Sequence, residues 1–405
     1  MGGRIMASTI NSSTSNGIVI TPDTSGEIEL QANGVTKAKV TANGLQDANG
    51  NSLRGGMYRN LLINGDMQIA QRGTSATGLT TTGYYTVDRW QFYAPSSPTY
   101  AFTMSQDTDV PLGQGFSSSV KLDCTTAQTP LATNSQLVLR HMIEGQHLQH
   151  LAYGTANAKS TTFSFWVKSN KTGTYITNLY QASGTRTISK SYTIDTADTW
   201  EKKTITFEGD TSGTINNNNG IGLYVMFHLA MGSNFQSGAL STSWASYTSS
   251  NYSVGQVNLA DSTSNYINIT GVQLEVGEGA SDFEHLPYDV QLARCQRYYI
   301  QYNQDKQIYG HISIGGLAAS TTECRHALAF PTTMRTVPSV SHNALLVQDG
   351  VTITAVTSVN TVGNQTSRES GFVLCNVASG LTQYRPYQLQ ANNNVNGYLA
   401  FSAEL

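Results

Sequence analysis

Residues 221–229 read Ile-Gly-Leu-Tyr-Val-Met-Phe-His-Leu, and apolar side chains occupy every second position. Successive side chains of a β-strand point to opposite faces of a sheet, so this alternation predicts a strand with one buried face. Residues 161–168, Thr-Thr-Phe-Ser-Phe-Trp-Val-Lys, follow the same pattern. In residues 266–276 the alternation changes phase around Thr270 and Gly271. A β-bulge is predicted there, because one extra residue turns every later side chain to the other face.

The composition extends this prediction to the whole chain. Of 405 residues, 12% are charged, 39% are hydrophobic and 9% are aromatic. The charged share is about half of the roughly 25% that is usual for soluble domains, but the apolar share is large enough for packed cores. Abundant Ser, Thr, Asn and Gly are typical of turns and of strands with one hydrated face. The sequence therefore predicts an all-β protein.

The first 56 residues differ from the rest. They contain no Trp, Phe or Cys, and the tripeptide Ala-Asn-Gly occurs at 32–34, 42–44 and 48–50. Asn-Gly is a strong hairpin signal because both turn residues tolerate positive φ. The segment is expected to form small strands joined by tight turns, with too few apolar side chains for a core of its own. Residues 1–56 are either a loose tail or a segment that folds against other copies of the chain or a docking partner.

Two further units are predicted beyond this segment. Strand patterns succeed one another over residues 57–288 and predict one two-sheet sandwich or jelly roll. Residues 289–297 have helical spacing, and Asp289 is placed to cap a short connecting helix. Short strand patterns then resume, so residues 289–405 are expected to form a smaller C-terminal β-sandwich. The predicted fold class is thus all-β, with a small-strand N-terminal segment and two sandwiches joined by a short helix.

Charge and cysteine content exclude several classes of function. Lys and Arg number 23 against 26 Asp and Glu, a net charge of −3, so the basic surplus on which phosphate binding rests is missing and no nucleic-acid partner is expected. No run of about 18 apolar residues is present, and neither membrane insertion nor a cleaved signal is expected. The four cysteines, without C-x-x-C spacing, are predicted to be buried free thiols of a protein made in a reducing cytoplasm: Cys124, Cys295, Cys324 and Cys375.

A histidine-rich stretch raises a metal hypothesis. His141, His147 and His150 fall within ten residues, and imidazole is a common zinc ligand. Glu144 lies nearby but no cysteine does. We favour histidines on the surface or in hydrogen bonds, so no metal site is predicted.

Acidic residues gather near the end of the large unit: Glu275, Glu278, Asp282 and Glu284. Paired carboxylates could serve glycoside hydrolysis or hold a calcium ion. Ordinary roles in turns and ion pairs are the simpler interpretation. No nucleotide-binding loop and no nucleophile elbow is present. No catalytic residue, no cofactor and no enzymatic activity are therefore predicted.

The loop over residues 231–258 carries the candidate binding residues. It is nearly uncharged, rich in Ser, Gly and Asn, and contains Trp244, Tyr247 and Tyr252. Flat rings beside hydroxyl and amide groups suit sugars, whose C–H faces stack while their hydroxyls hydrogen-bond. These three residues are the predicted carbohydrate-binding site. The alternative is that the rings pin a long loop to the sandwich.

Several stretches resemble a jelly-roll module of bacteriophage tail fibres and related virion proteins. The opening motif is Asn60-Leu-Leu-Ile-Asn-Gly-Asp-Met-Gln-Ile-Ala-Gln-Arg-Gly73. The same pattern continues at 85–90 (Tyr-Thr-Val-Asp-Arg-Trp), 164–168, 270–277, 283–288 and 295–299. Residues 26–34 and the closing 403–405 resemble the termini of phage fibres. The resemblance covers most of residues 57–299, and the two ends loosely.

The resemblance implies a homotrimeric virion fibre that resides in the virion and is made in the bacterial host cytoplasm. Its segment 1–56 would dock onto a phage tail, adaptor or baseplate protein, and its β domains would contact host surface polysaccharide or lipopolysaccharide, with residues 289–405 distal. Because only about 50 residues precede the globular part, it would be a short fibre, a distal piece or a head-attached one. The implied activity is multivalent adhesion without catalysis, in which linking weak sites raises avidity by roughly 10²–10⁴.

Two other classes of protein remain alternatives. A structural adaptor or capsid-decoration protein would share the docking segment but bind no receptor. A glycan-degrading tailspike would cleave what it binds, although such enzymes usually carry long solenoid repeats and no period of 20–50 residues is visible here.

Overall fold

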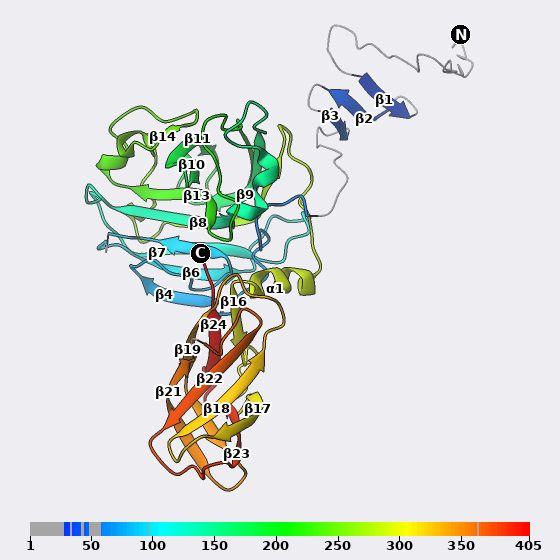
Figure 1. The fold of residues 1–405 in the computed structure, drawn as a ribbon. Helices are drawn as coiled ribbons and strands as arrows, with labels where there is room; N and C mark the ends of the chain where they lie inside the picture. Colours follow the sequence, from blue (N-terminus) through cyan, green and yellow to red (C-terminus); the bar gives the residue numbers. More distant parts are fainter. Residues whose placement is uncertain (1–27, 33–34, 42–43, 48–57, 97, 363) are drawn as a thin grey trace, which may run out of the picture.

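The computed structural model describes residues 28–32, 35–41, 44–47, 58–96, 98–362 and 364–405 (Figure 1). The described chain is built almost entirely of antiparallel β-strands, which confirms the predicted all-β class. No helix in this part of the chain has the length and apolar character needed to cross a membrane. All four cysteines are buried free thiols, as predicted.

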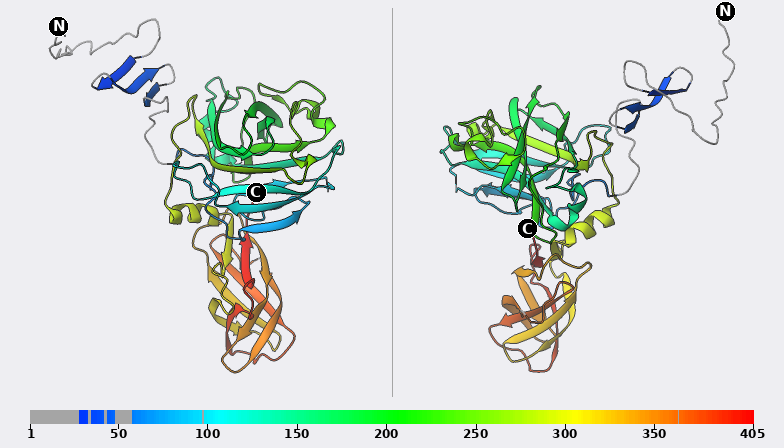
Figure 2. Two further views of the ribbon diagram at one scale, coloured as in Figure 1. Left: turned by 180° about the vertical axis from the view of Figure 1, so that it is seen from behind. Right: turned by 45° about the horizontal axis from the view of Figure 1, so that its top comes forward.

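The large unit is a sandwich of two six-stranded sheets within residues 58–276 (Figures 1 and 2). We call the first the groove sheet, with the order β14 (Ala245–Ser246), β11 (Arg186–Ile194), β10 (Gly173–Gln181), β13 (Ile221–Met231), β8 (Gln136–Glu144) and β5 (Trp90–Tyr93). The second has the order β12 (Glu201–Phe207), β9 (Thr161–Ser169), β15 (Tyr266–Val276), β7 (Ser119–Thr126), β6 (Ala101–Asp107) and β4 (Ser75–Leu79).

The core lies between the two sheets and follows the alternation of the sequence. From β9, Phe163, Phe165 and Val167 enter the core, and from β13 so do Val225 and Phe227. The Phe227 ring contacts both phenylalanines, at centroid distances of 5.3 and 4.9 Å. The inward faces predicted for residues 161–168 and 221–229 are thereby confirmed.

The predicted β-bulge is present in β15. Its pairing with β9 shifts between Thr270 and Gln273, and Gly271 adopts φ +60°, a conformation that glycine tolerates best. A Cβ added at Gly271 would lie 2.6 Å from the Phe116 ring. Residues on both sides of the shift therefore reach the same core: Ile267, Ile269, Val272 and Leu274.

The short helix α1 (Tyr288–Gln296) follows the sandwich, one residue earlier than predicted. The predicted cap by Asp289 is wrong. Pro287 occupies the N-cap position, no side chain caps the helix, and Asp289 lies in the first turn. Proline fits a helix start because it lacks an N–H and its φ is fixed near the helical value.

The C-terminal strands form a closed barrel rather than the two separate sheets of a sandwich. The barrel order is β17 (His311–Ala318), β18 (Glu323–Ala329), β22 (Ser370–Val377), β21 (Ile353–Thr361), β20 (Leu345–Gln348) and β23 (Pro386–Ala391). Beside it lies a three-stranded sheet, β16 (Tyr299–Tyr302), β24 (Tyr398–Ser402) and β19 (Ser339–Asn343). Closure leaves the barrel without exposed strand edges, which short strands in a small domain would otherwise present.

The described part of the N-terminal segment is a three-stranded sheet of β1 (Ile28–Ala32), β2 (Val35–Thr41) and β3 (Gly44–Asp47). These are the predicted small strands, whereas turn residues 33–34, 42–43 and the third Ala-Asn-Gly lie outside the described residues. Cross-strand register places five apolar residues on one face, which we call the apolar face: Ile28, Leu30, Ala38, Val40 and Leu45.

Buried ion pairs join the sandwich to the C-terminal domain. Glu404, just beyond β24, pairs with Arg72 and with Arg89, whose side chain is fully buried in the sandwich. Arg297, after α1, binds Glu144 of β8 with both Nε and Nη2, at 2.7 and 2.8 Å. Figure 2 shows the C-terminal end of the chain returning to this junction.

We predict that Glu404→Ala destabilises the protein by about 3–5 kcal/mol, because it leaves the buried Arg89 without its counter-ion. Urea denaturation followed by tryptophan fluorescence measures the change. The matched control is Glu323→Ala, which removes the partner of the exposed Arg325 and is expected to change stability by less than about 1 kcal/mol. Equal effects of the two substitutions would contradict a buried anchor at Glu404.

Candidate functional site

A hollow of about 240 Å³ lies on the outer face of the groove sheet, away from the core. Strands β10, β13, β8 and β5 form its floor, and the chain around η4 (Ser249–Asn251) forms one side. We call this hollow the tyrosine groove. Its lining residues are Tyr93, Gln136, Val138, Arg140, Tyr180, Tyr224, Met226, Tyr247 and Tyr252.

The register of the sheet places these side chains in rows across the strands. Tyr180 of β10 lies opposite Tyr224 of β13. In the next outward row Met226 of β13 lies opposite Arg140 of β8, which in turn faces Gln91 of β5. Residues directly opposite each other point to the same face. The groove is thus formed by outward positions of the same strands whose inward positions form the core.

The tyrosine rings contact one another edge to face. The Tyr180 centroid lies 5.7 Å from that of Tyr224 and 5.8 Å from that of Tyr247. Tyr247 in turn lies 5.0 Å from Tyr252. Edge-to-face contacts fix ring orientation and add modest stability beyond the burial of area. Tyr93, Tyr180, Tyr224 and Tyr247 stay partly exposed, so part of each residue can contact a ligand.

Arg140 is the charged residue of the groove. Its Nε donates a hydrogen bond to Oε1 of Gln91 at 2.7 Å. The guanidinium carbon lies 3.7 Å from the Tyr93 centroid and 5.0 Å from that of Tyr224. Stacking on aromatic faces is a favourable arrangement for a guanidinium, whose plane is weakly hydrated.

The structure separates the three predicted carbohydrate-binding residues. Tyr247 is exposed and lines the tyrosine groove. Tyr252 also lines it but is 6% exposed, and its hydroxyl points to Sδ of Met226 at 3.4 Å, so most of the ring serves packing. Trp244 lies outside the groove. Its Nε1 donates to the carbonyl oxygen of Glu208, and its ring packs edge-on against Tyr153 at 5.7 Å.

Sequence reasoning missed most of the groove. Tyr93, Tyr180, Tyr224 and Arg140 belong to strands, whereas the predicted binding residues all lie in the loop over residues 231–258. One signal was present, because Tyr224 occupies an outward position in the alternating stretch 221–229. Alternation does not indicate which outward residues of separate strands become neighbours, since that depends on sheet order.

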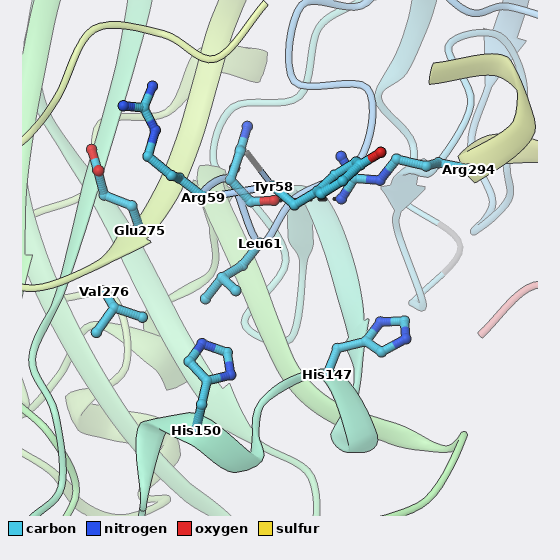
Figure 3. A pocket seen from close by; sticks show the side chains of 9 residues that line it. Tyr58, Arg59, Leu61, His147, His150, Glu275, Val276 and Arg294 are labelled. Atoms are coloured by element: carbon cyan, nitrogen blue, oxygen red, sulfur yellow. Dashed lines mark hydrogen bonds between the residues drawn. The ribbon is translucent and has the colours of Figure 1, made fainter. Parts of the chain in front are cut away.

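A second hollow, of about 400 Å³, lies where the start of the sandwich meets α1 and the turns after β8 (Figure 3). Figure 3 shows Arg294 beside the Tyr58 ring, with His147 and His150 on the opposite side. Burial lowers the pKa of both histidines, which are therefore neutral at pH 7. The hollow presents one phenol ring among its described lining residues and offers no stacked platform.

His141 and Glu275, from the histidine and acidic clusters, make internal hydrogen bonds. His141 is buried, and its Nε2 accepts a hydrogen bond from the backbone N–H of Ile63. Glu275 accepts hydrogen bonds from Ser281 N, Ser281 Oγ and Gln273 Nε2, at 2.7 to 3.0 Å. Within the described residues, no group of three or more His, Cys, Asp or Glu side chains is placed to hold a metal ion.

Comparison of the sequence with protein-family models and with curated proteins gave no match. Among solved structures, the chain is similar to the enzymatically active domain of tailspike protein 4 of bacteriophage CBA120, with 14% identity, a TM-score of 0.28 and coverage of 54% of this chain and 22% of that one. The chain is also similar to a family 11 carbohydrate-binding module of Clostridium thermocellum, with 12% identity and a TM-score of 0.25. This match covers 52% of this chain and 98% of that one. A xylan-binding domain of Paenibacillus barcinonensis is similar with 10% identity and a TM-score of 0.24. That match covers 51% of this chain and 95% of that one. At these values the comparisons do not assign a function.

Acid is expected to destabilise the protein through His228, which lies beneath the groove. Its ring is fully buried 4.7 Å from Tyr252, and burial lowers its pKa to about 3. Since the unfolded chain binds a proton near pH 6.5 and the folded chain does not, stability is full above that pH. It is then lost as the pH falls toward 3, by about 3–5 kcal/mol in total.

Chemical denaturation between pH 7 and pH 4 measures this loss. His228→Gln is expected to flatten the dependence on pH, while part of it remains because burial lowers the pKa of His141 and His326 as well. The control is His311→Gln, at an exposed position. This substitution should leave the dependence of stability on pH unchanged. A His228→Gln profile as steep as that of the wild type would refute the assignment.

Proposed function

We propose that the chain is a glycan-binding protein and that the tyrosine groove is its binding site. The observation that carries the proposal is the set of partly exposed rings on one sheet face: Tyr93, Tyr180, Tyr224 and Tyr247. A monomeric protein rarely exposes such a cluster without use, because each ring would gain free energy by burial.

The groove combines the two kinds of contact that a sugar needs. Sugar rings carry apolar C–H faces, which stack on aromatic rings, and hydroxyl groups, which need hydrogen-bond partners. The edge-to-face packing of Tyr180 against Tyr224 and Tyr247 holds the rings before a ligand arrives. Gln136 and Arg140 supply polar groups beside them. A preorganised site binds more tightly because less conformational entropy is lost.

Binding without catalysis is part of the proposal. The carboxylate cluster that could have served hydrolysis is used for internal hydrogen bonds, since Glu275 binds Ser281 and Gln273 and Glu284 accepts from the backbone N–H of Asn60. The backbone carbonyl oxygen of Asp282 accepts a hydrogen bond from Nη2 of Arg59. These contacts support structural roles for the acidic residues. A glycan-degrading tailspike remains the alternative activity.

We further propose a homotrimeric virion fibre, on the basis of the sequence resemblance. Residues 1–56 would dock on a phage tail, adaptor or baseplate protein, and the sandwich and distal C-terminal domain would reach host polysaccharide or lipopolysaccharide. The apolar face supports self-association, because Leu30, Val40 and Leu45 are 39–48% exposed on a sheet too small to be stable alone. An adaptor or capsid-decoration protein would share this segment but not the glycan affinity.

Removal of one ring from the groove should weaken glycan binding at least tenfold, a change of about 1.4 kcal/mol. We predict this for Tyr180→Ala and Tyr247→Ala, measured on an array of bacterial surface polysaccharides, while Tyr180→Phe retains binding because the ring stays. Trp244→Ala is the matched control. It should lower thermal stability, since Trp244 holds its loop, but leave affinity unchanged. Loss of binding in Trp244→Ala without loss of stability would move the site to the loop.

Light scattering of the full chain tests the fibre proposal. A trimer is expected at three times the chain mass of 43.7 kDa. Val40→Asp, on the apolar face, should lower the mass of the assembly in solution. Lys39→Gln, on the opposite face, should leave that mass unchanged. A wild-type monomer would contradict the homotrimer and favour the adaptor. It would leave the glycan site open to separate test.

A further inference from the structure

We propose that the tyrosine groove selects acidic glycans, and that Arg140 pairs with an oxyanion on the bound sugar. The inference rests on the proposed glycan-binding function and adds to it the chemical class of the ligand. An oxyanion here means the carboxylate of a uronic or sialic acid, or the phosphate of a phosphorylated sugar.

Arg140 has unused hydrogen-bonding capacity. Its Nε is taken by Gln91. Among the described residues, neither Nη atom has a hydrogen-bond partner, and no carboxylate lies within ion-pair distance of the guanidinium. A guanidinium carries five N–H donors in a planar fork that matches two oxygens of a carboxylate or phosphate. Arg140 therefore offers an oxyanion its two terminal nitrogens.

Several other arginines of this protein pair with carboxylates. Arg89 and Arg72 pair with Glu404, and Arg297 pairs with Glu144. The same holds for Arg186 with Asp210 and Arg385 with Asp349. Within the described residues, Arg294 and Arg335 are also partly buried without a carboxylate partner, but their terminal nitrogens donate to backbone carbonyl oxygens. Arg140 differs from both, because among the described residues its two terminal nitrogens have no hydrogen-bond partner.

The partly desolvated charge of Arg140 favours binding of an anion. Arg140 is half-buried between the Tyr93 and Tyr224 rings, and burial lowers its pKa. A cation that has lost part of its hydration gains more from an anion than an exposed one does, because the local dielectric constant is lower. Stacking on Tyr93 also restricts the guanidinium plane before binding, which reduces the entropy lost when a bidentate pair forms.

The position of Arg140 in the groove also favours contact with a bound sugar. Arg140 lies in the middle of the floor, on β8 between Met226 of β13 and Gln91 of β5. A sugar stacked on the tyrosines would therefore place its substituents within reach of the charge. Arginines at the rim of a site mainly steer encounter, whereas a central, partly desolvated one contributes to affinity and selectivity.

The experiment compares one polysaccharide with and without its charge. An array carries neutral oligosaccharides and acidic ones that contain glucuronate, galacturonate, sialate or sugar phosphate. The acidic polymer that binds best is then assayed beside its carboxyl-reduced or dephosphorylated form, which keeps the sugar backbone. We expect at least tenfold weaker binding after removal of the charge, and the carboxylate and phosphate arms identify the oxyanion.

Variants at the arginine complete the test. Arg140→Gln should remove the difference between the charged and uncharged forms, and Arg140→Lys should restore part of it because the charge returns without the fork. Arg325→Gln, at an exposed ion pair, is the control for net charge. The comparison of the two polymer forms uses the wild-type chain. It therefore decides whether the protein prefers the charged form even if a variant misfolds.

The outcomes separate this inference from the function on which it rests. Binding to neutral glycans alone, or equal binding of the charged and uncharged forms, overturns the role of Arg140 but leaves glycan binding in place. A charge preference that persists in a folded Arg140→Gln variant also overturns it. No binding to any glycan on the array overturns the proposed function and the inference together.

Discussion

The strict alternation of side chains along the groove sheet is the constraint on which the rest of the structure depends. On β13, Val225 and Phe227 enter the core, while Tyr224 and Met226 between them line the groove. A shift of one residue in the register would exchange the two sets, exposing the core residues and burying the tyrosines. The packing of the core therefore fixes the geometry of the groove, and a rigid sheet can hold several rings in place without help from a ligand.

The ionic junction adds a second constraint, at the level of domains. Glu404 lies at the end of the chain, but it neutralises Arg89 inside the sandwich, and Arg297 binds Glu144 near the same place. Charged pairs of this kind are directional, because a displaced partner leaves a buried charge unpaired. They join the sandwich to the chain segments that flank β16 and β24 of the C-terminal domain. In a fibre, such contacts would limit how far the groove can turn relative to the C-terminal domain.

The contrast between these arginines and Arg140 gives the proposed specificity its physical basis. The junction arginines have internal counter-ions and serve stability. Arg140 has tyrosine rings and one amide oxygen as neighbours, and its charge remains available for a partner outside the chain. Among the described residues, no acidic side chain forms an ion pair with Arg140.

The sequence by itself determined the all-β class, the inward faces of β9 and β13, the bulge at Gly271 and the small N-terminal strands, because each depends on local periodicity or turn chemistry. It also indicated Tyr247 as a ring that the structure places in the groove. Only the tertiary structure decided that Trp244 holds its loop, that the C-terminal strands close into a barrel, and that Tyr93, Tyr180, Tyr224 and Arg140 meet on one face. Those residues lie up to 131 positions apart in the chain, and only the order and register of strands, which depend on long-range packing, make them neighbours.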